Sequence, residues 1–122
     1  MSFLWYTFKV VNMEKSVKFY TDIVGLKEQR RFNPSPTTEI VFLGDEEGTK
    51  VELIFDRTNK ARLEYPDHMS MGFSIDDIEE KIKEVSQKGY AVHSGPIKPN
   101  ANTEFFFVLD PNGMKVQFVK EG

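Results

Sequence analysis

The chain has 122 residues, a formal net charge of −3 and no cysteine. This length corresponds to a single domain that is large enough to bury its own core. The lack of cysteine excludes disulfides, thiol nucleophiles and thiolate metal sites, and it is typical of a reducing compartment, so we expect a cytoplasmic protein. Lysine and arginine alternate with aspartate and glutamate, and without a basic stripe we expect no nucleic-acid partner.

The first half of the chain predicts a strand, a helix and three further strands. Residues 3–10 are rich in aromatic and β-branched types with apolar alternate positions, which predicts a strand rather than a signal peptide or a membrane span. Asn12 is a typical helix N-cap, and apolar residues recur at helical spacing from Met13 until Gly25 ends the pattern. The three strand-like runs that follow are residues 26–32, 38–44 and 50–55.

The second half repeats this order. Apolar alternation from Met69 to Ile75 predicts a strand, and either Asp76 or Asp77 is the expected N-cap of a helix that ends before Gly89. Three further strands are predicted at residues 90–96, 103–109 and 115–120.

The two halves are copies of one another at a single constant shift. The segment Phe42–Leu53 reappears, altered, as Phe107–Phe118 (107 − 42 = 65), and the same shift superimposes Phe8 on Phe73. An insertion in either half would have broken this register. Because solenoids need three or more stacked units, two copies are expected to pair around a pseudo-twofold axis.

We therefore expect one α+β domain made of two βαβββ repeats, residues 3–56 and 68–121, joined by a polar linker at 57–67. Each repeat should be a four-stranded sheet with a helix on one face. The other face of each sheet must be covered or form a cleft, so the two repeats should form a curved mixed sheet around a cleft.

Two stretches of sequence resemble a known superfamily: the helix opening Val11–Leu26 and the closing segment Asp110–Phe118. Together with the tandem βαβββ units they are similar to the vicinal oxygen chelate superfamily, which includes glyoxalase I, bleomycin-resistance proteins, fosfomycin-resistance enzymes and extradiol dioxygenases. The resemblance covers nearly the whole chain. It implies a small-molecule ligand in the sheet concavity and a homodimer, formed side by side or with exchanged halves.

In metal-dependent members the resemblance implies ligands on the first and last strands of each unit, here at Trp5, Glu52, Ser70 and Gln117. Only Glu52 is a usual ligand for a divalent metal such as Ni, Zn, Mn or Fe, and a buried ion would keep roughly one uncompensated positive charge. Gln117 cannot accept a proton, so the enediolate chemistry of glyoxalase I lacks its base. His68 is a weak substitute, because two residues move a strand side chain by roughly 7 Å. We expect a largely degenerate metal site.

Strand alternation places Glu52 opposite Val51 and Leu53, on the face away from the helix. Trp5 and Thr7 share the corresponding face of the first strand. A carboxylate on an enclosed sheet face needs a partner, which favours a functional role for Glu52.

We assign Glu52 and Gln117 as the candidate catalytic residues. The candidate ligand-binding residues are Trp5, Thr7, Ser70 and Phe106. The alternatives are a dimer contact for Trp5, core packing for Phe106, and ordinary wet-face positions for Glu52 and Gln117. Weaker candidates for an anionic ligand are Arg30, Arg31, Arg57 and Arg62.

These observations leave three functional hypotheses. The leading one is a glyoxalase-like protein that binds a small molecule without a working metal site, as bleomycin-resistance proteins do. The second is a metal-dependent lyase or isomerase of the glyoxalase I (lactoylglutathione lyase) type that uses Glu52. The third is a metal-free enzyme in which Glu52 acts as general base.

Overall fold

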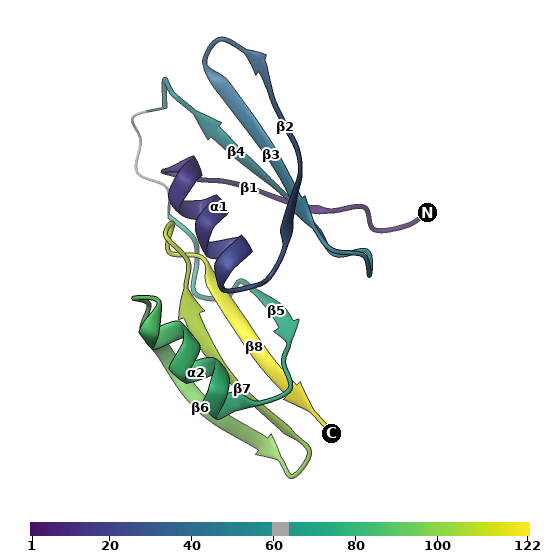
Figure 1. Cartoon of the computed structure of the whole chain (residues 1–122), viewed down its shortest axis with the longest axis vertical. Helices are drawn as coiled ribbons and strands as arrows, with labels where there is room; N and C mark the ends of the chain where they lie inside the picture. Colours follow the sequence, from purple (N-terminus) through teal and green to yellow (C-terminus); the bar gives the residue numbers. More distant parts are fainter. Residues whose placement is uncertain (60–63) are drawn as a thin grey trace. The chain divides into compact units, whose positions relative to one another are not determined.

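The computed structural model describes residues 1–59 and 64–122, and it divides into two compact units, Met1–Glu64 and Tyr65–Gly122 (Figure 1). The first unit contains β1 (Tyr6–Lys9), α1 (Met13–Asp22), β2 (Lys27–Ser35), β3 (Thr38–Gly44) and β4 (Lys50–Asp56). The second contains β5 (Ser70–Ser74), α2 (Ile78–Gln87), β6 (Val92–Asn100), β7 (Thr103–Leu109) and β8 (Lys115–Glu121). Residues 60–63 of the predicted linker, Arg62 among them, lie outside the described part of the chain.

Each unit is a four-stranded mixed sheet, in the order β1-β4-β3-β2 in the first unit and β5-β8-β7-β6 in the second. The first strand of each sheet runs parallel to the last, and the other neighbours are antiparallel. The helices, β3 and β7, and β4 and β8 all begin 65 residues apart, as the internal repeat predicts (78 − 13, 103 − 38 and 115 − 50). The α+β class and the two βαβββ units are confirmed.

Both helices begin and end where their capping residues predict. The side chain of Asn12 accepts a hydrogen bond from the backbone N–H of Lys15 at 3.0 Å, and that of Asp77 accepts one from Glu80 at 3.0 Å. Gly25 and Gly89 follow the helices at φ of 89° and 91°, a left-handed conformation that glycine adopts without strain. Within the described residues no helix is long and apolar enough to cross a membrane.

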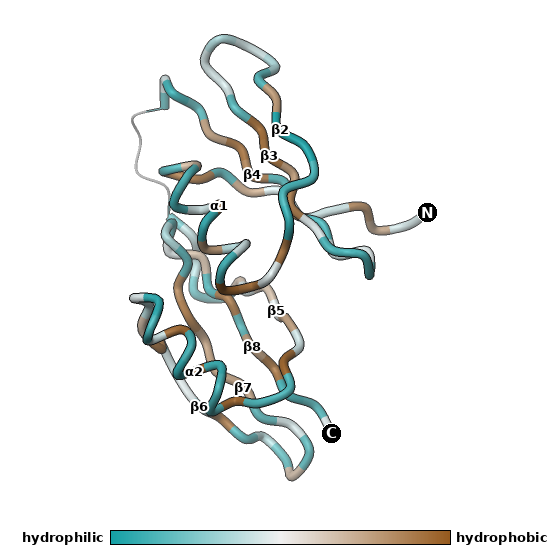
Figure 2. Tube along the Cα trace, viewed as in Figure 1, coloured by the Kyte–Doolittle hydropathy of each residue, from teal (hydrophilic) through white to brown (hydrophobic). Residues whose placement is uncertain are grey.

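The core of each unit lies between its helix and one face of its sheet. Residues completely shielded from solvent in the first unit include Phe19, Val41 and Leu53. Those in the second unit include Val85, Val108 and Val116. In Figure 2 the hydrophobic colour follows the central strands β3, β4 and β8. Each buried aliphatic or aromatic side chain contributes about 1.5–3 kcal/mol, so these two faces hold the sheets and helices together.

The strand ends differ from the sequence prediction in three places. β2 continues past Pro34 to Ser35, and β6 continues past Pro96 to Asn100. Both are edge strands with shifts in register, and a proline is tolerated there because it removes no essential ladder hydrogen bond. β1 begins only at Tyr6, so the preceding apolar residues stay exposed instead of extending the strand.

The turns before β4 and β8 give a matched pair of aspartates in different environments. Asp110 is buried, and its Oδ1 accepts hydrogen bonds from the backbone N–H groups of Asn112 and Met114, each at 2.8 Å. Asp45 occupies the same place in the first unit and accepts two backbone hydrogen bonds at 2.9 Å, but it is exposed. If the aspartate side chain were removed, water could hydrogen-bond to the backbone N–H groups of the exposed turn at Asp45. It could not reach those of the buried turn at Asp110.

We expect Asp110→Ala to lower the free energy of unfolding by about 3 kcal/mol, because it leaves buried backbone donors without an acceptor. Asp45→Ala should lower the free energy of unfolding by about 1 kcal/mol or less, because solvent reaches the equivalent backbone donors of this turn. Urea unfolding followed by circular dichroism measures both values. Equal losses in the two variants would contradict the difference in burial.

Candidate functional site

Glu52 lies on the helix-free face of the first sheet, by which we mean the side opposite α1. Its neighbours Val51 and Leu53 are buried toward the helix, as strand alternation predicts. In the sheet register Glu52 is the partner of Thr7 on β1 and of Phe42 on β3. Three strands therefore bring these side chains to the same row of one face.

The Glu52 carboxylate is held by a neighbouring hydroxyl. Thr7 Oγ1 donates a hydrogen bond to Glu52 Oε1 at 2.7 Å, a short distance typical of a hydroxyl bonded to a carboxylate. This bond fixes one carboxylate oxygen and leaves the other to accept hydrogen bonds from a bound molecule. The structure thus brings together two of the residues chosen from the sequence.

Aromatic rings extend from Glu52 across the same face. The ring of Trp5 meets that of Phe42 edge to face, with centroids 5.2 Å apart and an interplanar angle of 80°. Phe42 stacks in turn with Phe32 at 6.5 Å and 12°. Trp5 keeps 39% of its surface exposed, so the wall is accessible. The two perpendicular rings form an apolar corner beside a carboxylate, which suits a flat organic molecule carrying a hydrogen-bond donor.

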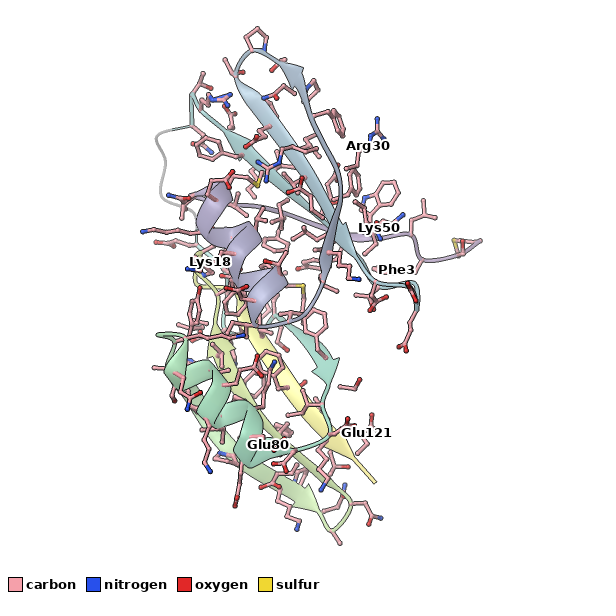
Figure 3. The ribbon with its side chains drawn as sticks, in the orientation of Figure 1. Phe3, Lys18, Arg30, Lys50, Glu80 and Glu121 are labelled. Atoms are coloured by element: carbon pink, nitrogen blue, oxygen red, sulfur yellow. The ribbon has the colours of Figure 1, made fainter. Side chains whose placement is uncertain are left out.

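Of the three arginine candidates in the described part of the chain, only Arg30 lies on this wall. Its guanidinium lies 4.4 Å from the centroid of the Phe32 ring, and Figure 3 shows Arg30 and Lys50 on the side of the sheet away from α1. Arg31 is instead taken up by three carboxylates within 3.2 Å, those of Glu14, Glu28 and Glu39. Its hydrogen bond lowers the pKa of Glu28. Arg57 lies beyond the end of β4.

The helix-free face of the second sheet carries Ser70 and Gln117. Gln117 is the register partner of Gly72 on β5 and of Phe107 on β7, and Ser70 is the partner of Lys115. The face is therefore built like that of the first sheet, with an amide in place of the carboxylate and a glycine in place of Thr7.

The expected position of Phe106 is wrong. Phe106 is completely buried on the face covered by α2, where its ring lies 5.4 Å from that of Phe118. Lys81 of α2 lies over Phe118, which confirms that this is the helix-covered side. The neighbouring Phe107 points to the helix-free face instead. Three successive phenylalanines hide the alternation, but the shift of 65 already pairs Phe107 with Phe42.

The sequence interpretation also missed Phe42 and Phe32 as parts of the first wall. The signal was the hairpin register, since an antiparallel strand pair puts Phe42 directly opposite Glu52. A separate, open hollow of about 610 Å³ lies beside the end of β3 and the acidic turn that follows it, and none of the predicted site residues line it.

Nearly the whole chain matches one family of known proteins. The model of the Glyoxalase/Bleomycin resistance protein/Dioxygenase superfamily matches residues 2–118. The chain belongs to this superfamily. A lactoylglutathione lyase of Haemophilus influenzae is 30% identical over 126 aligned residues, which cover 98% of this chain and 93% of that protein.

Two solved structures share the fold of this chain. The trypanothione-dependent glyoxalase I of Leishmania major superposes with a TM-score of 0.82 at 22% identity, covering 99% of this chain and 87% of that one. The antibiotic-binding protein TnmS3 of Streptomyces sp. CB03234 gives a TM-score of 0.75 at 18% identity, covering 100% and 97%. These two likenesses concern the fold alone.

The residues at the four positions that the resemblance implies for metal ligands do not fit a divalent metal. Trp5 offers an indole ring packed against Phe42, and Glu52 supplies a single carboxylate already bonded by Thr7. Ser70 and Gln117 add only neutral oxygens. His68 lies exposed in the turn before β5. Among the described residues no three His, Asp or Glu side chains form a metal-binding cluster.

Phe42→Ala should expose Trp5 and shift its fluorescence to longer wavelength, because the edge-to-face partner of the indole is removed. The free energy of unfolding should fall by at least about 1 kcal/mol, the contribution of such an aromatic pair. Trp5 is the only tryptophan, so steady-state emission and urea unfolding report on it directly. Phe42→Tyr keeps the ring and should preserve the emission; a shift of equal size in both variants would show that the contact does not form.

Proposed function

We propose that this protein binds a small organic molecule on the helix-free face of the first sheet, with Glu52 as polar anchor and Trp5 and Phe42 as apolar wall. The observation that supports this proposal most is the hydrogen bond from Thr7 to Glu52 beside two perpendicular aromatic rings. A carboxylate held in one orientation loses little further freedom when a ligand binds to it.

The chemistry of this face favours binding over transformation. Flat ligands gain apolar contact from the two rings, and the second carboxylate oxygen accepts a hydrogen bond from an amine or hydroxyl group. On the helix-free face of the second sheet, taken by itself, Gln117 and Ser70 are proposed as ligand contacts, since an amide can both donate and accept. We also propose a homodimer, supported by the exposed apolar residues Phe3 and Leu4.

The proposal is tested with a panel of aromatic fragments that carry an amine, a hydroxyl or no polar group. Fragments with a donor should quench Trp5 fluorescence in a saturable way. In Glu52→Gln, loss of the charge-assisted hydrogen bond should weaken amine fragments by about fivefold, because the carboxylate is exposed to solvent. Glu46→Gln, which removes the same charge from an exposed turn, is the control and should leave affinity unchanged. Absence of saturable binding, or equal affinity in both variants, would refute the proposal.

The same preparation should bind no divalent metal tightly. Equilibrium dialysis against Ni²⁺, Zn²⁺, Mn²⁺ and Fe²⁺ measures this directly. One ion held per chain in the wild type and lost in Glu52→Ala would contradict a metal-independent site.

A second candidate function is a metal-dependent lyase or isomerase of the glyoxalase I type. It is favoured by the 30% identity to a lactoylglutathione lyase over nearly the full length of both chains. The residues described above offer neither the donor set of a metal nor a proton acceptor at Gln117, and this weighs against it.

A hemithioacetal assay with metal-supplemented protein separates the two functions. Under the binding proposal the wild type should show no more turnover than Glu52→Gln. The reason is that the four positions discussed above supply neither the ligands for a metal ion nor, at Gln117, a group that accepts the substrate proton. Turnover that is clearly higher in the wild type, and lost in Glu52→Gln, would establish the enzyme and overturn the binding proposal.

A further inference from the structure

The turn between β7 and β8 contains a dipeptide that is prone to deamidation. Asn112 is followed by Gly113, and none of the other five asparagines precedes a glycine. Asparagine is a thermolabile residue, because its side-chain amide is lost as ammonia when the backbone nitrogen of the next residue attacks it. Glycine has no side chain to hinder this attack, so the reaction is fastest at an Asn-Gly pair.

The reaction needs only the chain itself and water. The Gly113 backbone nitrogen gives up its proton and bonds to Cγ of Asn112, while the bond from Cγ to the side-chain nitrogen breaks. That nitrogen takes up the proton and leaves as ammonia, and a succinimide ring remains. Water then adds to one of the two ring carbonyls and breaks its bond to the ring nitrogen, which gives aspartate or isoaspartate. No group is oxidised or reduced.

The folded turn holds both reacting groups in hydrogen bonds to Asp110. The Gly113 N–H, whose proton the reaction must remove, donates to the backbone carbonyl of Asp110 at 3.1 Å. Asn112 Nδ2 donates to Asp110 Oδ2 at 3.0 Å, which ties the side-chain amide to the carboxylate. The backbone N–H of Asn112 donates to Oδ1 of the same carboxylate at 2.8 Å. The attack therefore requires both groups to leave Asp110 and turn toward each other.

Burial and charge oppose the reaction in the same way. Asn112 keeps only 8% of its surface exposed, so little water reaches its amide. The attacking nitrogen carries negative charge, and the adjacent Asp110 carboxylate disfavours a second negative charge beside it. The folded turn therefore suppresses both the attack and the opening of the ring.

The equivalent turn of the first unit shows how the product would differ here. The shift of 65 pairs Asn112 with Glu47 (112 − 65 = 47). The carboxylate of Glu47 is tolerated because that turn is exposed. At position 112, deamidation would replace the amide that donates to Asp110 Oδ2 by a second carboxylate in a buried turn. The two carboxylates would repel each other, and one hydrogen bond would be lost.

We propose that Asn112 is a latent deamidation site, which the hydrogen bonds to Asp110 keep closed in the folded chain and which opening of the turn exposes. The modification is permanent, and its product destabilises the turn that protected Asn112. A transient opening is thus converted into a lasting loss of stability, because chemical modification of an open state makes unfolding irreversible. The proposal uses no residue assigned to the ligand site and does not depend on the function proposed above.

The test compares folded and urea-unfolded full-length protein, incubated at the same temperature and at neutral pH. Mass spectrometry of the peptide that contains Asn112 measures the aspartate and isoaspartate formed with time. The unfolded chain should deamidate at least about tenfold faster than the folded one, because opening of the turn costs free energy. Equal rates, or no modification of the unfolded chain, would overturn the proposal.

Three variants separate the protection by Asp110 from the overall stability of the protein. Asp110→Ala removes the carboxylate that holds Asn112, and without urea it should speed deamidation at least about fivefold. Asp45→Ala, the equivalent change in the first turn, should modify Asn112 at the wild-type rate. Val85→Ala removes buried volume from the core of the same unit. It is compared with Asp110→Ala at equal free energy of unfolding, set by adding urea to the more stable variant, and equal rates would overturn the proposal.

The effect of the product is measured with Asn112→Asp. This variant should raise the equilibrium constant for unfolding at least about tenfold, because a buried donor beside a carboxylate becomes a second carboxylate. Asn102→Asp adds the same charge in an exposed turn and should unfold like the wild type. An Asn112→Asp variant as stable as Asn102→Asp would overturn the proposal. Should Asp110→Ala not fold, as judged by circular dichroism, this comparison and the rates of the folded and unfolded wild type still decide the outcome.

Discussion

Each four-stranded sheet of this protein has a single helix to cover it, and this constraint shapes everything else. One face is buried against the helix, and alternate residues must then project from the other. Val51 and Leu53 belong to the first face and Glu52 to the second. A slip of one residue would exchange the faces, so the same hydrophobic packing that stabilises the fold also holds Glu52 in register with Thr7 and Phe42.

Both repeats obey this constraint, but they carry different side chains at equivalent positions of the helix-free face. The backbone register that pairs Thr7 with Glu52 also pairs Gly72 with Gln117, 65 residues further on. Neither helix-free face contributes to the core between the helix and the sheet of its own unit, so substitutions there change mainly what the face can bind. Superfamily membership therefore accounts for the scaffold, whereas the chemistry has to be deduced from the side chains of each face.

The features that sequence could predict are those with a local physical signal. The caps Asn12 and Asp77, and the strands at 38–44 and 103–109, follow from hydrogen-bonding side chains and clear periodicity. Phe106 was misplaced because three consecutive phenylalanines carry no alternation. The ends of β2 and β6 were misplaced because whether a proline ends a strand depends on its being an edge strand, which is a property of the sheet and not of the segment.

The exposure of these faces limits what their charges can contribute. A solvent-exposed ion pair is worth at most about 1 kcal/mol, less than a factor of ten in affinity. Binding to either face must therefore draw most of its free energy from apolar contact with rings such as Trp5, Phe42 or Phe107. Glu52 then acts mainly on selectivity, by favouring a ligand with a donor group. A flat ligand with the right end group satisfies both requirements, whereas a small polar ion satisfies neither.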